Sequence, residues 1–466
     1  MPSKKTKIIA TIGPSVNSEE KVERLIKAGV NVFRFNFSHG NYEEHKQKID
    51  WVNKLKSKYP VAILADLGGP KIRIGKIKDK KIVLRRGQEF ILTTEKIIGN
   101  DEIVYASIEG IIDSLRIGDR ILLADGSVEL IVKDKKDKEV ITRVRIGGVV
   151  SEGKGVNIPS EHLDIEVITE KDKKDLAFAL RNGADAIAMS FVRNSEDILK
   201  LKELIEKEGK TVPVIAKIER KEAIENFEEI LSVCDGIMIA RGDLGVEIPF
   251  QKIPVVQKKL IYMSRQSYKP VITATQMLKS LLENPLPTRA EITDVANAVL
   301  DGSDALMLSE ETAVASNPVK SVEIMVKIIK EAEKLREEIP IPFKAKKDVE
   351  CEIAHAAFKF TITLGAKAII TPTSSGATAR RVSSLRPHVP ILAITENMQV
   401  YNFLNFSFGV HPVFVEKLND LNQVVMLGKK YLKEKKLARD GDYIVITGGF
   451  PFGKPGTTNL VKVEKI

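Results

Sequence analysis

An apolar run that ends in charged side chains is found in PVIAKIER, residues 213–220. As a strand, this run places Lys217 and Glu219 on the same face, because alternate residues of a strand share a face. Lysine and glutamate are almost never fully buried without a partner. The two side chains therefore form either a simple ion pair or part of a polar site at the end of a strand.

Seven further runs have the same form, with apolar residues followed by a polar or glycine-rich end. They are KIIATIG from Lys7, VFRFNFSHG from Val32, VAILADLGG from Val61, AIAMSFVR from Ala186, GIMIARGD from Gly236, VITATQ from Val271 and ALMLSEET from Ala305. Between most of them lies a stretch of helical periodicity, such as the one preceded by Asn194, a suitable N-cap, and ending at Gly209. Eight strand-then-helix units predict an α/β fold, a (β/α)₈ TIM barrel with active-site residues at the C-terminal ends of its strands.

The alternation is interrupted between the third and fourth runs, where short strands and tight turns predict an inserted all-β lid domain. After a proline-containing linker, EEIPIPFKAKK, helix and strand alternate again and predict a C-terminal α/β domain. The expected domains are the barrel in two parts, residues 1–69 and 155–340, a β-barrel lid over 70–154, and a regulatory domain over 341–466. Pro70 and residues 153–155 would act as hinges.

Composition excludes several classes of protein. The chain has 466 residues and a formal charge of +10, but its basic residues are mixed with glutamates along amphipathic helices. This favours an ordinary solvated surface or anionic metabolites over nucleic acid. Cys234 and Cys351 match no metal or redox spacing, which predicts a reducing compartment. The apolar runs are too short to span a membrane, and the N-terminus lacks a secretion signal. We expect a soluble, cytoplasmic protein.

The second run alternates in character. Phe33, Phe35 and Phe37 fall on one face, and Arg34, Asn36 and Ser38 fall on the other. The aromatic face would contact helices, and the polar face would look into the barrel mouth. The alternative is a half-exposed strand of an antiparallel sheet.

A divalent-metal site is predicted where two neighbouring strands end. The sixth run supplies Arg241, Gly242 and Asp243 at a position equivalent to Glu219. Because adjacent parallel strands lie about 5 Å apart, Glu219 and Asp243 can converge on one ion. Carboxylates, water and phosphate suit Mg²⁺ or Mn²⁺. With Lys217 alongside, the predicted site suits phosphoryl transfer.

Two stretches of the sequence have features of phosphate-binding loops. GGFPFGKP, from Gly448, is rejected as a Walker A motif, because Pro455 replaces the required Ser/Thr and no helix follows, although it could bind phosphate by other means. In the C-terminal domain, a Ser/Thr/Gly loop precedes a predicted helix that carries Arg380 and Arg381. Its residues Thr373, Ser374, Ser375, Gly376 and Thr378 form either a regulatory phosphate site or a set of helix caps.

These residues lie within longer stretches that resemble one family over essentially the whole chain. The stretches are TKIIATIGPS, NVFRFNFSHG, KGVNIP, IAKIER, IMIARGDLGVEIP, TATQML, PTRAEITDVANAVLDGSDALMLS and ETA. In this order, with an insert in the corresponding place, they resemble the pyruvate kinases, in particular the short microbial, potassium-independent Lys-type branch. The resemblance implies transfer of phosphate from phosphoenolpyruvate to ADP, giving pyruvate and ATP, as the final step of glycolysis.

The resemblance also implies roles for individual residues. Lys217 would stabilise the phosphoryl group in transit, Arg34 would hold the phosphate, and Glu219 and Asp243 would bind Mg²⁺ or Mn²⁺. The pyruvate portion would lie on Gly242, Asp243 and Thr275, with Thr275 close to the path of the proton. The nucleotide would face Asn36, Phe37, Ser38, His39, Arg73 and Lys154.

The chain departs from the family pattern in three places. The monovalent-cation region comprises Asn36, Ser38, Asp66, Leu67 and Lys71. There, Leu67 lacks a threonine hydroxyl and Lys71 replaces a glutamate, so we expect activity without K⁺. Glu310 replaces a glycine, and no role is assigned to it. The effector loop reads S-S-G-A-T, which leaves the phosphorylated effector open; the family further implies a homotetramer.

Two other functions remain as alternatives at this point. One is a Mg²⁺-dependent lyase or mutase that needs no nucleotide, which a lack of ADP dependence would favour. The other is a non-catalytic metabolite sensor, which unchanged turnover in Lys217→Met would favour.

Overall fold

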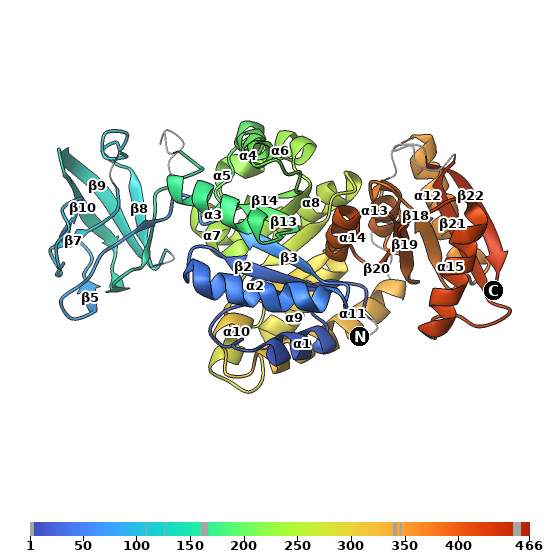
Figure 1. Ribbon diagram of the computed structural model, residues 1–466. Coiled ribbons are helices and arrows are strands. Elements are labelled where there is room, and N and C mark those ends of the chain that lie inside the picture. The colour runs from blue at the N-terminus through green and yellow to red at the C-terminus, as the bar shows by residue number, and fades with distance from the viewer. Residues whose placement is uncertain are drawn as a thin grey trace.

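The chain is described by a computed structural model over residues 4–108, 110–124, 126–159, 166–338, 343–344, 347–450 and 458–466. Figure 1 shows its three parts in a row, with the β-rich insert at one end, the barrel in the centre and the C-terminal domain at the other end. The predicted boundary at residues 340–341 and most of the rejected Walker A stretch lie outside the described residues.

Eight parallel strands close into a barrel, as the sequence predicted. They are β1 (Lys7–Thr11), β2 (Val32–Asn36), β3 (Ala62–Asp66), β13 (Ala186–Met189), β14 (Val214–Ile218), β15 (Gly236–Ala240), β16 (Val271–Ala274) and β17 (Ala305–Leu308). Their order around the barrel is β1-β17-β16-β15-β14-β13-β3-β2. Each strand comes from one of the eight predicted runs, so the predicted fold class is confirmed.

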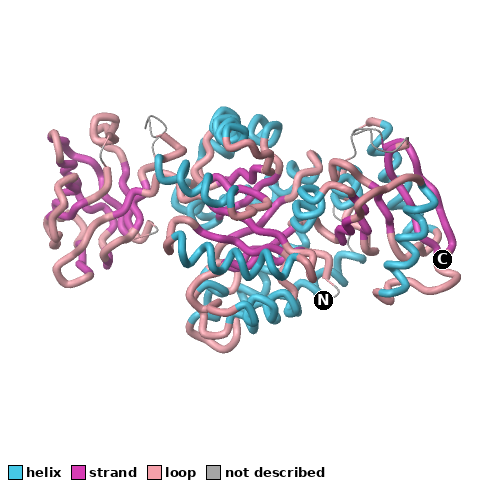
Figure 2. The backbone as a smooth tube through the Cα atoms, in the orientation of Figure 1, coloured by secondary structure: helices cyan, strands magenta, loops and turns pink. Residues whose placement is uncertain are grey.

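Helices surround this barrel, as Figure 2 shows with strands in magenta inside cyan helices. They are α1 (Glu19–Ala28), α2 (Tyr42–Lys56), α3 (Glu170–Arg181), α4 (Ser195–Lys207), α5 (Lys221–Glu225), α6 (Phe227–Val233), α7 (Arg241–Glu247), η1 (Phe250–Lys252), α8 (Ile253–Gln266), η2 (Lys279–Leu282), α9 (Arg289–Asp301), α10 (Glu310–Ala313) and α11 (Pro318–Glu338). Asn194 caps α4 as predicted, because its side chain accepts a hydrogen bond from the amide of Asp197. The helix ends at Lys207, two residues before the predicted end at Gly209.

The barrel strands alternate between two apolar clusters. In β14, Ile215 belongs to the cluster inside the barrel, and Ala216 and Ile218 belong to the cluster between barrel and helices. Lys217 and Glu219 therefore follow Ile215 on the inward face. In the same way Phe33 and Phe35 of β2 lie in the outer cluster, which confirms the predicted aromatic face.

The insert is an all-β unit with its own apolar cluster. Its strands are β4 (Ile72–Arg73), β5 (Lys81–Leu84), β6 (Glu89–Thr93), β7 (Ile103–Tyr105), β8 (Arg120–Leu123), β9 (Val128–Lys136), β10 (Glu139–Ile146), β11 (Gly148–Ser151) and β12 (Gly155–Asn157). Seven form a sheet in the order β4-β12-β8-β9-β10-β6-β7, and β11 pairs with β5. The first and last strands, β4 and β12, pair antiparallel where the insert joins the barrel, with Gly155 opposite Arg73 and Val156 opposite Ile72.

The C-terminal domain is a five-stranded sheet in the order β20-β19-β18-β21-β22, parallel except for β22. Its elements are α12 (Val349–Thr363), β18 (Ile369–Pro372), α13 (Ala377–Ser384), β19 (Ile391–Thr395), α14 (Met398–Phe403), η3 (Leu404–Phe406), β20 (Val410–Phe414), α15 (Leu421–Glu434), β21 (Tyr443–Gly449) and β22 (Thr458–Lys465). Phe403 and Phe406 join the cluster inside the barrel. The buried Arg386 pairs with Asp304, which lies just before β17, at 2.7 Å. The C-terminal domain thus covers the end of the barrel at which the strands begin, opposite their C-terminal ends. Within the described ranges, no helix is long and apolar enough to cross a membrane.

Candidate active site

The ammonium of Lys217 lies at the centre of the site, at the end of β14. Its Nζ is 2.9 Å from Glu219 Oε1, 3.2 Å from Asp66 Oδ1 and 2.6 Å from the hydroxyl of Ser190. Burial opposes the charge of Lys217, but the carboxylates of Asp66 and Glu219 outweigh burial and raise its pKa. Lys217 is therefore a permanent cation held between groups from three strand ends.

Arg34, in the middle of β2, supplies a second cation. Its Nε is 2.6 Å from Asp66 Oδ2, and its Nη1 donates to the hydroxyl of Thr11 at 3.0 Å. Burial favours the protonated carboxyl of Asp66, but Lys217 and Arg34 hold its pKa below the ordinary value. Asp66 thus joins the two cations and fixes their separation.

The two predicted metal ligands are both carboxylates at strand ends. Glu219 is buried, and its Oε2 accepts a hydrogen bond from the amide of Phe191 at 2.9 Å. Asp243 lies in the first turn of α7, is half-buried, and contributes with Glu219 to the raised pKa of Lys217. Among the described residues, no group of three or more His, Cys, Asp or Glu side chains is placed to hold a metal. Two carboxylates, with the other positions left to water and substrate, suit a divalent cation that prefers oxygen ligands.

Thr275 occupies a strained loop beside α7. Thr275 and Gln276 have φ of 73° and 56°, which is the left-handed region that non-glycine residues seldom adopt. The amide of Gly242 donates to Thr275 Oγ1 at 2.8 Å. Arg241 holds the loop from behind: Nη2 donates to the carbonyl of Thr275 at 2.8 Å and Nη1 pairs with Asp294 at 2.7 Å. The sequence predicted Arg241 at the end of a barrel strand. In the structure its side chain supports the loop that carries Thr275.

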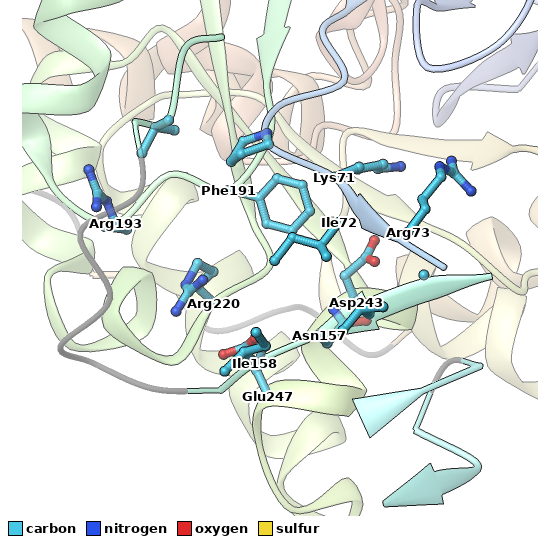
Figure 3. A pocket seen from close by; sticks show the side chains of 14 residues that line it. Lys71, Ile72, Arg73, Asn157, Ile158, Phe191, Arg193, Arg220, Asp243 and Glu247 are labelled. Carbon is cyan, nitrogen blue, oxygen red and sulfur yellow. The ribbon is translucent and has the colours of Figure 1, made fainter. Parts of the chain in front are cut away.

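A cavity of about 180 Å³ lies between insert and barrel. Figure 3 shows its labelled side chains, which come from the insert and its junction (Lys71, Ile72, Arg73, Asn157, Ile158) and from the barrel (Phe191, Arg193, Arg220, Asp243, Glu247). Burial raises the pKa of Glu247 to about 7, although Arg220 opposes the shift. Lysine and arginine outnumber acids in this wall, so the cavity suits an anionic ligand.

The predicted nucleotide residues are only partly brought together. Arg73 lines the cavity, and its Nη1 donates to the carbonyl of Gly153 at 3.0 Å. Lys154 is exposed. Neither Lys154 nor residues 36–39 line the cavity. Burial lowers the pKa of His39, and the charges of Arg73 and Lys71 add to the effect. His39 thus lies within electrostatic reach of the cavity.

Two further residues of the predicted monovalent-cation region, Lys71 and Leu67, lie close to the same centre. Lys71 is partly accessible from the cavity, which it lines. Protein surrounds its ammonium group, and the resulting loss of hydration lowers the pKa of Lys71. Lys217 adds to the effect, and Glu219 opposes it. The side chain of Leu67 is buried in the apolar cluster, whereas its carbonyl accepts from Ser190 Oγ at 2.7 Å.

Ser190 and the amide of Phe191 contribute to the site without having been predicted from the sequence. Both follow β13, in the run AIAMSFVR, and both bind the charged centre: Ser190 contacts Lys217, and Phe191 contacts Glu219. The polar Ser190 was a usable signal, because it directly follows its strand as Glu219 follows β14. The contribution of a backbone amide leaves no trace in the sequence.

Three of the five residues of the predicted effector loop have hydroxyls that make hydrogen bonds within the domain, and the regulatory role of the loop stays a prediction. Thr373 Oγ1 accepts from the amide of Gly376 at 2.9 Å, within the loop. Thr378 is buried, and its hydroxyl is 2.7 Å from that of Thr458. Ser374 and Ser375 are exposed. Gly376 is the N-cap of α13, and the hydroxyl of Ser375 accepts a hydrogen bond from the amide of Ala377 at 3.4 Å, a contact of the kind that the capping alternative predicts.

A barrel whose strand ends gather a lysine, an arginine and an acidic pair beneath an inserted sheet defines a metal-assisted phosphotransferase. The family model described as pyruvate kinase, barrel domain, matches residues 3–322, and that described as pyruvate kinase, alpha/beta domain, matches residues 351–464. The chain belongs to the pyruvate kinase family.

Several relatives match almost the whole chain. A pyruvate kinase of Thermotoga maritima is 46% identical over 463 residues, which cover 99% of each chain. A pyruvate kinase of Thermococcus litoralis is 42% identical over 476 residues, 100% of this chain and 99% of the relative. Pyruvate kinase 2 of Synechocystis is 44% identical over 99% of this chain and 79% of its own length.

Proposed function

We propose that this chain transfers the phosphoryl group of phosphoenolpyruvate to ADP and releases pyruvate and ATP, as the final step of glycolysis. One observation carries the proposal: the ammonium of Lys217 is held between Asp66 and Glu219, with Arg34 on the far side of Asp66. The ion pairs with Asp66 fix the two cations relative to each other. Such preorganised charges stabilise a transferring phosphoryl group without reorganising during the reaction.

In this proposal Lys217 contacts the phosphoryl oxygens in transit, and Arg34 binds the phosphate of phosphoenolpyruvate. The amides of Gly242 and Asp243, together with Thr275, bind the pyruvate portion. Because the Gly242 amide donates to Thr275 Oγ1, a substrate carboxylate that binds there would share or replace that bond. Thr275 would then lie next to the carbon of enolpyruvate that gains a proton.

The family implies a divalent metal requirement, and we propose Mg²⁺ or Mn²⁺ as the ion. Glu219 and Asp243 would hold it, because both are carboxylates beside the same cation. The bound ion would supply charge neutralisation of the substrate oxygens. We assign the nucleotide to Arg73, Lys154 and residues 36–39, with Arg73 supported by its place in the cavity wall.

We also propose that activity does not require K⁺. Lys71 reaches the same charged centre as Asp66, Glu219 and Asp243, since all three raise its pKa against the effect of burial. Its ammonium would supply the positive charge that K⁺ brings in other members of the family.

Coupled initial-rate measurements with phosphoenolpyruvate test both proposals. We expect pyruvate formation that requires ADP and Mg²⁺ or Mn²⁺, at rates unchanged when tetramethylammonium replaces K⁺. Pyruvate formation without ADP would contradict the phosphotransfer, and a strict K⁺ requirement would contradict the role of Lys71.

Further assignments follow from the resemblance. We propose a homotetramer, a cytoplasmic location, supported by the two buried free cysteines, and a phosphorylated effector acting on the C-terminal domain. We propose the domain boundaries given above, except that β12 pairs with β4 and β8, which favours an end of the insert near residue 158.

A further inference from the structure

The loop that carries Thr275 is held in a strained shape at the end of β16. Thr275 and Gln276 follow the strand directly, and both have a backbone φ in the left-handed region, at 73° and 56°. Non-glycine residues seldom adopt this conformation, and two in succession persist only where surrounding contacts fix them. Two charged side chains on neighbouring elements, Arg241 and Glu311, make such contacts. We call this pair the loop clamp.

Arg241, the first residue of α7, holds the loop from the side of β15. Its Nη2 donates to the carbonyl of Thr275 at 2.8 Å and contacts the sulfur of Met277 at 2.9 Å. Its Nη1 is 2.7 Å from Asp294 of α9, and this contact orients the guanidinium. Because the donors of a guanidinium are rigidly spaced, these bonds together fix the position of the loop relative to α9.

Glu311 holds the same loop from the side of β17. It lies in α10 and is buried. Its Oε1 accepts from the amide of Leu278 at 3.1 Å, and its Oε2 accepts from the amide of Ser309 at 2.7 Å. The carboxylate thus ties the loop after β16 to the chain that follows β17. Met277 and Leu278 are buried in the cluster between barrel and helices, which leaves the loop little room to shift.

The hydroxyl of Thr275 takes its position from this loop. Its Oγ1 accepts from the amide of Gly242 at 2.8 Å and donates to the carbonyl of Ala274 at 2.6 Å. Because Gly242 follows Arg241 in α7, the same turn of helix binds both the hydroxyl and the loop backbone. The cations of the site, by contrast, are held through Asp66 of β3. A shift of the loop would therefore displace the hydroxyl and leave these cations in place.

We propose that Arg241 and Glu311 are positioning residues for the step that converts enolpyruvate to pyruvate. The proposal rests on the proposed function, in which the O–P bond of phosphoenolpyruvate breaks and the phosphorus bonds to a terminal oxygen of ADP. The enolate left behind forms its carbonyl as its methylene carbon takes up a proton derived from water. The loop clamp holds the Thr275 hydroxyl next to that carbon, so it controls this step more than the phosphoryl transfer.

Kinetics of the full chain test the proposal with Arg241→Gln and Glu311→Gln. Glutamine lacks the second arm of the guanidinium, and at position 311 it retains one acceptor for two amides. Arg24→Gln in α1 and Glu323→Gln in α11, both exposed, are the matched controls. Asp294→Asn loosens the hold on Arg241 from a half-buried position and keeps the test usable if the clamp variants are unstable. Melting temperatures establish which variants fold.

The experiment separates the two chemical steps. Rapid-quench measurement of ATP formed in a single turnover reports phosphoryl transfer, and kcat for pyruvate in H₂O and in D₂O reports protonation. We expect the clamp variants to lower kcat by roughly 10–100-fold, the effect of misplacing a reacting group by about 1 Å, and to form ATP within about threefold of the unaltered rate. The ratio of kcat in H₂O to kcat in D₂O should rise, because protonation becomes the slowest step.

Asp294→Asn should show a smaller change of the same kind, and both controls should stay within about twofold of the unaltered chain. A loss of ATP formation as large as the loss of kcat, an unchanged isotope ratio, or an unchanged kcat in both clamp variants would overturn the proposal. If those variants do not fold, an unchanged kcat in Asp294→Asn overturns it. A lack of ADP-dependent pyruvate formation by the unaltered chain would instead contradict the proposed function, and this proposal with it.

Discussion

At the scale of single residues, the site is organised around shared charge. Asp66 contacts both Lys217 and Arg34, and Glu219 contacts Lys217 and the amide of Phe191. Each group is therefore positioned by at least two others. Replacement of any one changes the position or charge of its neighbours as well as its own contribution.

Lys217→Met should lower kcat by at least about 10²–10³-fold, because it removes a preorganised cation from the transferring group. The KM for ADP should change much less. The measurement is the coupled assay with circular dichroism as a check on folding, and Lys200→Met on the surface of α4 is the control.

Since Lys217→Met leaves Asp66 and Glu219 facing each other, Lys217→Arg provides a second variant that retains the charge. We expect it to be impaired too, because a planar guanidinium does not match the positions of Ser190 and Glu219. Unchanged kcat in both would contradict the role of Lys217.

Lys71→Glu should make activity depend on K⁺, because it replaces an ammonium near Asp66 and Glu219 by a further negative charge. The rate ratio with and without K⁺ is the measurement. Lys78→Glu, on the exposed surface of the insert, makes the same change in net charge and should remain independent of K⁺. The double variant Leu67→Thr with Lys71→Glu should respond more strongly to K⁺. Equal rates in both salts for both Lys71 variants would show that this side chain does not replace the ion.

At the scale of elements, capping decides where helices begin. The side chain of Asn194 accepts from the amide of Asp197 at 3.1 Å, next to the loop that carries Ser190 and Phe191. Asn194→Ala should lower the free energy of unfolding by about 1 kcal/mol, and Asn194→Ser should cost much less. The midpoint of urea denaturation measures both. Equal midpoints for the alanine variant and the unaltered chain would show that the cap contributes nothing to stability.

The helices and strands were also the features that the sequence predicted best. Each barrel strand is a short apolar run with a polar end, and periodicity with capping residues such as Asn194 located the helices, so the eight units followed from local patterns. The charged centre was predictable in part, because Lys217 and Glu219 share a strand face. Its connection to Asp66 and Arg34 was not, since β13 separates β14 from β3 in the sheet and their side chains meet only inside the closed barrel.

Other features depend on contacts that no local pattern records. Residues 373–378 read as one loop of hydroxyls, but Thr378 faces Thr458, which lies 80 residues along the chain in β22. A cavity that Ser374 and Ser375 line exists only because a second domain packs against the barrel.

At the scale of the whole molecule, the contact between barrel and C-terminal domain buries charged groups. Lys7, at the start of β1, is buried and donates to the carbonyl of Val410 at 2.6 Å. Burial lowers its pKa to about 8, against the opposing charges of Glu333 and Asp304. Lys4, close by, has its pKa lowered to about 7 by burial and by Lys7 itself.

Stability should therefore rise with pH between about pH 8 and pH 10. In this range the unfolded chain, with a lysine pKa near 10.4, binds a proton at Lys7 that the folded chain has released. One such group contributes at most about 1.4 kcal/mol per pH unit. Lys7→Met should reduce the slope of the urea midpoint against pH, with the remainder due to Lys4. Lys327→Met, on the exposed side of α11, should leave the slope unchanged. An identical slope in Lys7→Met would contradict the assignment.

The junction between insert and barrel has a mechanical consequence. Because β4 and β12 are hydrogen-bonded to each other there, the two chain crossings form one antiparallel ribbon. A two-stranded ribbon bends readily across its face and resists bending within its own plane, where the hydrogen bonds would have to break. The ribbon therefore sets the direction in which the insert swings, and Arg73, which belongs to it, travels with every such movement.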